Sequence, residues 1–469
     1  MKNIYKLFAI LTLSASMLAC SEEFIERDRP LVMNEAIIYA DADYIESALL
    51  GCYSQFKASN PSFMSGLAYV VFDSRGDDIV NVSNPVTMQH TYEMKVLPTE
   101  LENNRIWNYA YYTINACNIF LDNLVKYECE EVLGSTVYKQ YVAEAKFVRA
   151  YCYYVLVNLY SQPYSLNPDA PAVPLRTVGL TAAGNNDCPL STISKIYEQM
   201  LDDCIPADLP NAPGTYDGVT RASAAAAHML RMRVYMAEKD WDKAIAEGTA
   251  VTGYELDGDV KNLYGTDTYT SKEIIFALPM STQDNPNTQM SAAEHFSEQA
   301  TVCWLDTEGG IMSQDGYFLD KDQRISKLVS DPDSNGYRYS KKFVDYGGKL
   351  DWLPLIRFAE TKLNLAECYV NKGNTTAAKT CLKDVRSRSI AAADDVIDVD
   401  ALSGGNLTTA VYNERRLEFI CEGIRGVDII RRGETFVKKN SSVDISVTPK
   451  DSYYTWPIPD AEKTYNKAI

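Results

Sequence analysis

The sequence predicts a mainly α-helical fold that also contains an irregular, loop-rich region and a few short strands. Apolar residues recur at every third or fourth position over long stretches, which is the period of a helix with one buried face. Two stretches contain two such patterns separated by a short polar turn. Residues from about 253 to 335 instead combine Gly, Asp and aromatic residues without a sustained period, so we expect an inserted loop region there.

The N-terminal part of the chain is predicted to form single long helices. The helical period covers residues 42–57, 105–125 and 138–160. Residues 223–252 and 359–388 are predicted to form helix pairs, because each range has one polar turn between two periodic halves. Alanines in both pairs allow close helix packing. The pairs resemble tetratricopeptide units of about 34 residues, which stack side by side.

The segments between the helices are predicted from composition and from short apolar runs. Residues 161–190 are rich in Pro, Gly and Asn and should form surface loop. Residues 272–280 have the composition of a strand. The apolar run 70–72 is also interpreted as strand-like, so the polar residues from Asp73 to Asp78 should follow it as a loop.

The N-terminus resembles a lipoprotein signal peptide. Two lysines precede an apolar run, residues 7–18, which is shorter than the roughly 20 residues of a membrane-spanning helix. The sequence Leu-Ala-Cys at 18–20 resembles the bacterial lipobox, in which the cysteine is lipidated, although Met17 stands where leucine is usual. An ordinary signal peptide followed by a coincidental cysteine is the alternative. We therefore expect Cys20 to carry a lipid anchor.

This anchor divides the chain into a signal peptide (1–19), a lipidated cysteine with its tether (20–40) and a body (41–469). The sequence Ser-Glu-Glu after the cysteine resembles the signal that exports Bacteroidetes lipoproteins to the outer face of the outer membrane. A flexible acidic tether is the alternative. One acyl chain binds a membrane only marginally, so stable anchoring needs a multiply acylated cysteine. The predicted location is the extracellular face of the outer membrane.

Composition argues against several classes of protein. The net charge of −18 disfavours nucleic-acid binding and electrostatic docking to anionic lipid. The sequence contains no phosphate-binding loop, H-E-x-x-H or G-x-S-x-G, and we predict no cofactor and no metal site. The acidic stretches 306–310 and 331–336 have oxygen ligands for calcium but not the spacing of an EF-hand.

The cysteines other than Cys20 form no C-x-x-C pair. Several lie within apolar helical patterns, where cysteine is typical of a small buried apolar residue. Cys188 and Cys204 are the most plausible local disulfide if the protein is exported.

Several stretches carry a family resemblance, including residues 41–56 and 106–124, which look like the first helices of the family. Residues 143–166 contain Ala-Glu-x-x-Phe-x-Arg-Ala-Tyr, and residues 354–370 contain Arg-x-Ala-Glu. Residues 412–434 are the most specific, with Glu-Arg-x-x-Glu followed by Glu-Gly-x-Arg and an Asp. Residues 454–466 contain Pro-Ile-Pro, a Glu and a final Asn. Together they resemble the SusD/RagB family of outer-membrane nutrient-binding lipoproteins.

The resemblance implies a mostly α fold, in which four tetratricopeptide-like helix pairs support an irregular region that carries the ligand site. It implies a non-enzymatic cell-surface protein that captures oligosaccharides and delivers them to a SusC-type TonB-dependent transporter. Peptide binding by the same fold is one alternative, and a surface glycoside hydrolase is another. The sequence departs from the family at Gly426-Val427, where an aromatic pair is usual, and at Asn466-Lys467, where Asn-Pro is usual.

Polar candidates for ligand contact cluster around residue 75. Asp73, Arg75, Asp77 and Asp78 match a part of the family near the ligand face. Carboxylates and an arginine fork can pair with neighbouring sugar hydroxyls. The alternative is turn chemistry combined with a salt bridge.

Aromatic candidates lie mainly in the irregular region. Trp304, Tyr317 and Phe318 lie where the family places aromatic residues that stack on sugars, and Tyr92 and Tyr264 are weaker candidates of the same kind. The alternative is that these rings fix the long loop to the helices.

Two further groups are interpreted as structural. Glu414, Glu418 and Glu422 share one helical face and resemble catalytic carboxylates, but a charge network between neighbouring helices explains them better. Trp107 and Trp241 occupy helix-packing positions and are predicted to belong to the core.

Overall fold

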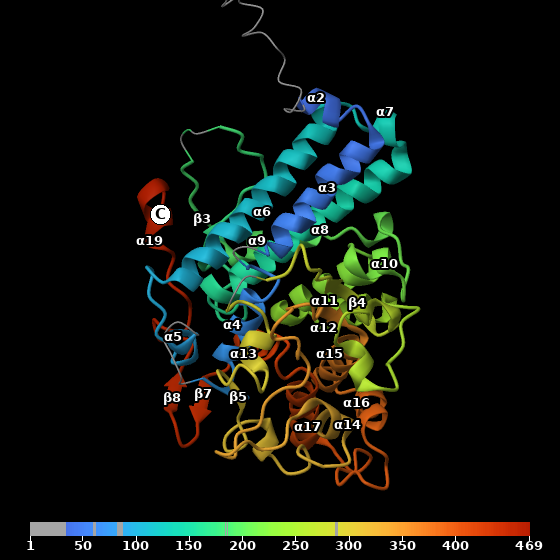
Figure 1. Ribbon diagram of the computed structural model, residues 1–469, viewed down its shortest axis with the longest axis vertical. Coiled ribbons are helices and arrows are strands. Elements are labelled where there is room, and N and C mark those ends of the chain that lie inside the picture. Colours follow the sequence, from blue (N-terminus) through green and yellow to red (C-terminus); the bar gives the residue numbers. More distant parts are fainter. Residues whose placement is uncertain (1–33, 60–61, 82–87, 183, 185, 287–288) are drawn as a thin grey trace, which may run out of the picture.

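The computed structural model is shown in Figure 1. It describes residues 34–59, 62–81, 88–182, 184, 186–286 and 289–469. The predicted signal peptide, Cys20 and the tether up to residue 33 lie outside these ranges. The described part of the chain is rich in helices and has few, short strands, which confirms the predicted fold class. None of its helices has the length and apolar character needed to cross a membrane.

Three long helices run side by side in the upper part of Figure 1. They are α3 (Ala42–Lys57), α6 (Leu101–Lys126) and α8 (Ser135–Tyr160). The three predicted helices are confirmed, although α6 and α8 begin about one turn earlier than expected. The carboxylate of Asp41 caps α3 by accepting hydrogen bonds from two N–H groups of its first turn. A shorter helix, α9 (Ile193–Asp203), packs against α8.

Two helix pairs form the neighbouring part of the fold. One consists of α11 (Ala224–Glu238) and α12 (Trp241–Ala250), and the other of α15 (Phe358–Asn371) and α16 (Thr375–Ser389). Side-chain oxygens of Ser, Asp or Asn cap α11, α12 and α16. Helix α12 packs against α15, and α15 packs against α17 (Gly404–Glu418). This stacking of pairs is the arrangement typical of tetratricopeptide-like repeats.

The apolar run 70–72 is helical, so the prediction of a strand there is wrong. It belongs to α4 (Leu67–Arg75), in which every residue is buried. A segment buried on all sides has no polar face, and its periodicity therefore cannot distinguish a helix from a strand. Helix α4 packs against α18 (Arg425–Arg432), which places Asp73 and Arg75 on a buried helix rather than in a loop.

The described strands form antiparallel pairs. The strand predicted within residues 272–280 is confirmed, because Ile274–Leu278 forms β4. The pairs are β1 (Ile79–Val80) with β5 (Trp304–Leu305), β2 (Pro171–Pro174) with β3 (Leu190–Thr192), β4 with β6 (Leu353–Arg357), and β7 (Phe436–Lys439) with β8 (Asp444–Val447).

Residues 253–335 consist mainly of irregular backbone with short elements, as predicted. Short helices occur here and elsewhere: α2 (Glu35–Ile38), α5 (Gln89–Tyr92), α7 (Glu130–Leu133), α10 (Tyr216–Thr220), α13 (Ala293–Phe296), α14 (Gln323–Leu328) and α19 (Asp460–Tyr465).

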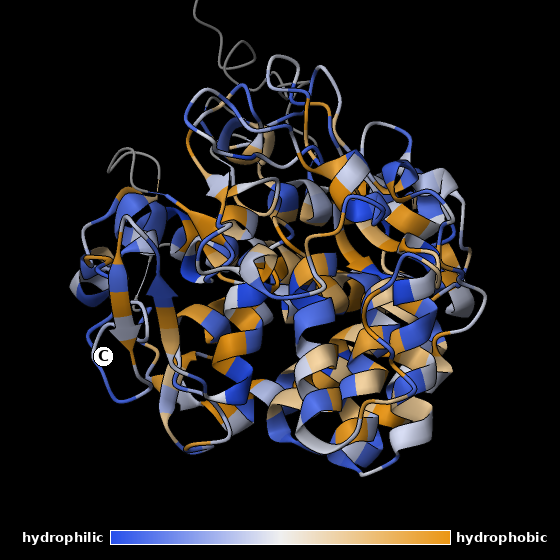
Figure 2. Ribbon diagram, turned by 90° about the horizontal axis from the view of Figure 1, so that it is seen from below, coloured by the Kyte–Doolittle hydropathy of each residue, from blue (hydrophilic) through white to orange (hydrophobic). Residues whose placement is uncertain are grey.

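Apolar side chains from the helices and from the irregular region form one large core. In Figure 2 hydrophobic and hydrophilic stretches alternate along the helices, as amphipathic helices require. Trp107 is 1% exposed and belongs to this core, and Trp241 is partly buried against it. The cysteines of the described ranges are free, so Cys188 and Cys204, the most plausible local pair, do not form a disulfide. Cys204 is buried at the end of α9, whereas the thiol of Cys188 faces the Leu175 carbonyl.

Candidate ligand-binding site

Asp73 and Arg75 lie in the interior of the protein. The Asp73 carboxylate accepts a hydrogen bond from the Gly423 N–H, and burial raises its pKa well above the usual range. The Arg75 guanidinium donates to the carbonyls of Asn158 and Tyr454, and burial lowers its pKa to about 10. Neither side chain is available to a ligand on the surface.

Asp77 and Asp78 hold two C-terminal helices together. Asp77 accepts hydrogen bonds at 2.5 and 2.8 Å from Arg425 on α18. Burial alone would raise the pKa of Asp77, but Arg425 and Arg416 outweigh it and lower the pKa to about 2. Asp78 binds Arg416 on α17 at 2.6 Å and accepts the Ile311 N–H at 2.7 Å. These contacts favour the salt-bridge alternative for the polar candidates around residue 75.

Four of the predicted aromatic residues contact the protein itself. Tyr92 is fully buried beneath the Lys438 ammonium, 4.0 Å from its ring centre, and burial raises its pKa to about 12. Tyr317 is buried and donates to a backbone carbonyl of α17. The Tyr264 hydroxyl donates to a buried carboxylate, and half-buried Phe318 packs under an arginine. These contacts favour the structural alternative for the four residues: Tyr317 fixes the irregular region to α17, and the other three rings hold neighbouring segments together.

Trp304 is partly buried, as Tyr264 and Phe318 are, but it differs from the other candidates because it borders a hollow beside an exposed tyrosine. Its indole stacks on the ring of Tyr337, with ring centres 4.2 Å apart and planes within 15° of parallel. The tyrosine is 39% exposed. Strand β5 positions the indole, because Trp304 pairs with Val80 of β1 and the next residue donates its N–H to the Arg338 carbonyl at 2.8 Å.

The stacked rings border a small hollow of about 110 Å³, which we call the aromatic hollow. Its polar groups include the side chains of Glu308, Asn335, Asn440, Ser441 and Ser442. The hollow is lined by Val80 and by residues 304–308, 335–337 and 440–442. These segments lie far apart in the sequence and meet where β5 approaches the β7–β8 hairpin (Figure 1).

Hydrogen bonds between the lining segments set the shape of the aromatic hollow. Asn440 donates to Asp306 at 2.7 Å and to the Tyr92 hydroxyl at 3.3 Å. Glu308 accepts from the N–H and the hydroxyl of Ser441, at 2.6 and 3.0 Å. A hollow held in this way presents its rings and amides in a fixed arrangement, which reduces the entropy cost of binding a ligand.

The two stretches considered as calcium ligands use their first carboxylates to order backbone. Asp306 accepts the N–H groups of residues 308 and 309, and Asp333 accepts those of residues 335 and 337. Across the described ranges, no three His, Cys, Asp or Glu side chains lie where they could hold one metal ion. His90 and His228 each contact a glutamate, and His295 is buried.

Comparison with known proteins identifies the family. The model described as "SusD family" matches residues 312–469, and the model "Starch-binding associating with outer membrane" matches residues 52–236. A solved SusD superfamily protein from Bacteroides fragilis is 48% identical with a TM-score of 0.88, and the match covers 92% of this chain and 99% of that one. This chain belongs to the SusD superfamily. The predicted resemblance is therefore confirmed.

Other relatives are more distant. A SusD-like carbohydrate binding protein from Bacteroides vulgatus is 20% identical with a TM-score of 0.75, over 92% of this chain and 97% of that one. The SusD-like protein P25 of Formosa agariphila is 26% identical over 291 residues, which make up 59% of this chain and 52% of that protein. The match to P25 thus spans about half of its length.

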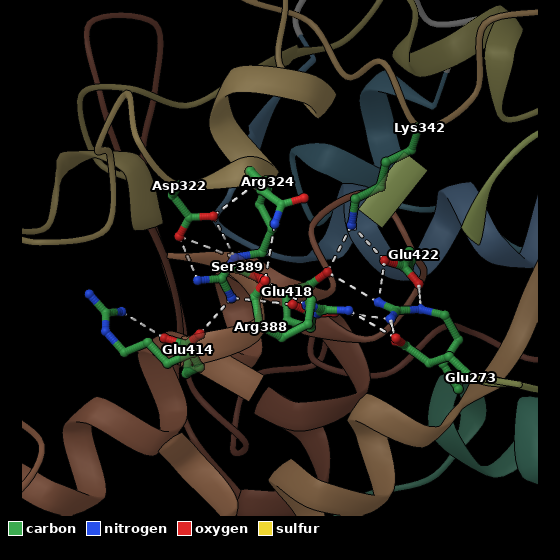
Figure 3. A network of polar contacts seen from close by, with 12 residues as sticks. Glu273, Asp322, Arg324, Lys342, Arg388, Ser389, Glu414, Glu418 and Glu422 are labelled. Atoms are coloured by element: carbon green, nitrogen blue, oxygen red, sulfur yellow. Dashed lines mark hydrogen bonds and ion pairs between the residues drawn. The ribbon is translucent and has the colours of Figure 1, made fainter. Parts of the chain in front are cut away.

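In this SusD superfamily member, the three glutamates of the C-terminal sequence form a buried ion network (Figure 3). Glu418 accepts hydrogen bonds from Arg324, Arg357 and Arg388 at 2.6 to 3.2 Å. Burial alone would raise the pKa of Glu418, but these arginines outweigh it and hold the pKa well below the usual range. Glu414 pairs with two arginines, and Glu422 pairs with an arginine and a lysine. The charge-network interpretation of these carboxylates is confirmed, but they do not share one helical face, because α17 ends at Glu418 and Glu422 lies in the turn after it.

The departures from the family sequence have local explanations. A Cβ atom at Gly426 would lie 2.3 Å from the Phe72 carbonyl oxygen, so glycine permits the close packing of α18 on α4. Asn466 is buried, and its side chain forms two hydrogen bonds with the backbone of Cys188, at 2.8 and 3.0 Å. The usual asparagine thus fixes the loop segment 161–190 without the proline.

Sequence reasoning missed Tyr337 and the polar residues of the β7–β8 turn. Tyr337 follows an Asn-Gly pair, and an aromatic residue directly after such a turn sequence was the available signal. The turn residues 440–442 gave no comparable signal, because Asn-Ser-Ser is an ordinary turn sequence.

Proposed function

We propose that this protein captures oligosaccharides at the cell surface and that the aromatic hollow is its binding site. The observation that carries the proposal is the stacked pair of Trp304 and Tyr337 beside a hollow lined by amides and hydroxyls. Family membership supports it, because the matching family model is described as starch-binding and one solved relative is named as a carbohydrate binding protein.

The aromatic hollow offers the two kinds of contact that a sugar needs. An exposed aromatic ring packs against the apolar C–H face of a sugar and excludes water from both surfaces at little entropy cost. The side chains of Asn335 and Ser442 offer donors and acceptors that can orient the hydroxyl groups, while Asn440 holds the wall of the hollow in place. Trp304 is therefore the one residue selected from the sequence that we propose as a ligand contact. Tyr337, which the sequence did not indicate, is the second proposed contact.

The proposed role ends with delivery of the ligand to a SusC-type TonB-dependent transporter. A lipid on Cys20 would hold the protein on the outer face of the outer membrane, close to the mouth of that transporter. Tethering raises the effective concentration of captured ligand at the channel without any new contact. No catalytic step is part of this role.

Calorimetric titration of the purified protein tests the proposal against a panel of neutral oligosaccharides and peptides. Mass spectrometry of each mixture distinguishes binding from cleavage. We expect saturable sugar binding with intact ligand, whereas peptide binding alone or cleaved sugar would favour one of the two alternatives.

Substitution then tests the aromatic hollow itself. Trp304→Ala should weaken sugar binding about tenfold, because one stacked ring contributes roughly 1.5 kcal/mol. The matched control is Tyr112→Ala, which removes a 57% exposed ring from α6. The helical circular dichroism spectrum should not change in either variant. Equal affinity of the Trp304 variant and the control would exclude the aromatic hollow as the site.

A further inference from the structure

A second depression, which we call the lysine groove, shares a loop with the aromatic hollow. It has a volume of about 390 Å³, and its lining includes Lys261, Lys327, Lys341 and Lys342. This concentration of lysines is unusual for a chain with a net charge of −18. Residues 335–337 line the aromatic hollow and residues 340–342 line the lysine groove.

Two of these lysines already have partners. Lys342 is buried and donates to Glu422 at 2.5 Å and to a backbone carbonyl at 2.8 Å. Lys327 pairs with Asp259 at 2.9 Å. Lys261 and Lys341 are exposed, and neither forms an ion pair with any residue that the structure describes. Two ammonium groups therefore remain for an anion.

A buried hydroxyl in the same groove also lacks a partner. Ser297 lines the groove and is 3% exposed, yet its Oγ has no hydrogen-bond partner among the described residues. Buried polar side chains are nearly always paired, because an unsatisfied hydroxyl loses its contacts with water and gains nothing in return. An acceptor atom of a ligand would satisfy this hydroxyl.

The groove also contains two carboxyl groups, those of Glu298 and Asp351. One oxygen of Asp351 accepts two backbone N–H groups at 2.7 Å, from Val344 and Asp345, and burial raises the pKa of this carboxyl. Glu298 is exposed at the rim. The Tyr264 hydroxyl donates to Glu422 and is not free.

We propose that the lysine groove binds the carboxylate or sulfate group of an acidic oligosaccharide whose neighbouring sugar packs on Trp304 and Tyr337. The inference rests on the proposed function and names the ligand class. Tyr337 and Ser340 are three residues apart, so their Cα atoms are separated by at most about 11 Å, a distance that an oligosaccharide spans. The acidic surface repels anions elsewhere, which makes the groove the favourable position for the charge.

Matched pairs of probes test the proposal. Trigalacturonate is compared with its neutral methyl ester, and a sulfated galactose oligosaccharide with its desulfated form. Sodium sulfate alone serves as the probe for a simple anion. The acidic sugars should bind more tightly than their neutral partners, and their affinity should fall as salt rises from about 50 to about 500 mM.

Substitutions test which side chains bind the anionic group of the sugar. Lys261→Ala and Lys341→Ala should each weaken acidic-sugar binding about fivefold and leave neutral-sugar binding unchanged. Lys139→Ala is the matched control, because Lys139 is an exposed lysine on α8. Ser297→Ala should weaken acidic-sugar binding while raising the melting temperature of the free protein, since it removes an unsatisfied buried hydroxyl. A purely structural serine would not give that combination.

Each outcome decides the inference separately from the proposed function. Equal binding of acidic and neutral sugars would overturn the lysine groove and leave the aromatic hollow in place. Binding of sulfate as tightly as of the acidic sugars would reduce the groove to a simple anion site and overturn the proposal. If the unsubstituted protein binds none of the sugars, both the inference and the proposed function are overturned. Binding of acidic sugars that is weakened by the lysine variants and by Trp304→Ala would support both.

Discussion

Glu367 offers a direct test of how far buried ion pairs stabilise this protein. The side chain lies on α15, is fully buried, and accepts four hydrogen bonds at 2.7 to 3.2 Å from Arg431 and Arg432 on α18. Burial alone would raise its pKa from 4.5, but the two arginines outweigh burial and lower it to about 2. A difference of one in pKa between the folded and unfolded states corresponds to about 1.4 kcal/mol. Ionisation of this carboxyl group therefore contributes roughly 3 kcal/mol to the free energy of unfolding at pH 7.

We expect Glu367→Gln to lower the free energy of unfolding at pH 7 by about 3 kcal/mol, measured by urea denaturation. Because the folded pKa lies below the unfolded one, this stabilisation is complete above about pH 4.5 and is lost as the pH falls towards 2. The variant should therefore lose less stability than the wild type over that range. Glu131→Gln, at an exposed position on α7, is the control. The reasoning would be refuted if the free energy of unfolding of the Glu367 variant lay within 1 kcal/mol of that of the control and depended on pH as in the wild type.

Two further outcomes are expected. Trp107→Ala should lower the free energy of unfolding by about 3–5 kcal/mol in the same assay, because the ring is buried against Tyr111 and Tyr160; a loss below 1 kcal/mol would contradict its place in the core. Cys20→Ala should move the protein from the outer-membrane fraction to the soluble fraction, and unchanged retention in the membrane would exclude the lipid anchor.

The sequence predicts the exposed helices best, because two independent signals agree there. Helix α3 has an apolar face that repeats at helical spacing and an aspartate at position 41 that caps its first turn, and its bounds match the predicted ones. Helix α4 lacks both signals. All nine of its residues are buried and no side chain caps it, so only its tertiary contacts distinguish it from a strand.

The candidate site is predicted only in part, because its residues meet through long-range pairing. Trp304 is recognisable as an aromatic residue in an irregular region, but its stacking on Tyr337 depends on the β1–β5 pairing and on a loop more than thirty positions further along. The prediction that Asp73 and Arg75 contact the ligand fails for a related reason. A charged residue in a sequence suggests the surface, and only the partner positions, such as Gly423 and Tyr454, show that these two side chains form hydrogen bonds inside the protein.

The buried ion network explains how an irregular region can hold the candidate site in a fixed shape. Arg324 on α14 pairs with Glu414 and Glu418, and Lys342 pairs with Glu422, so both ends of the loop that carries Tyr337 are tied to α17 and the turn after it. Apolar packing tolerates small shifts, whereas a buried ion pair loses several kcal/mol if its partner moves away. Removing these charges from water costs free energy, but their pairing fixes the position of the loop. The network therefore supports the aromatic hollow through the position of the loop rather than through any contact with a ligand.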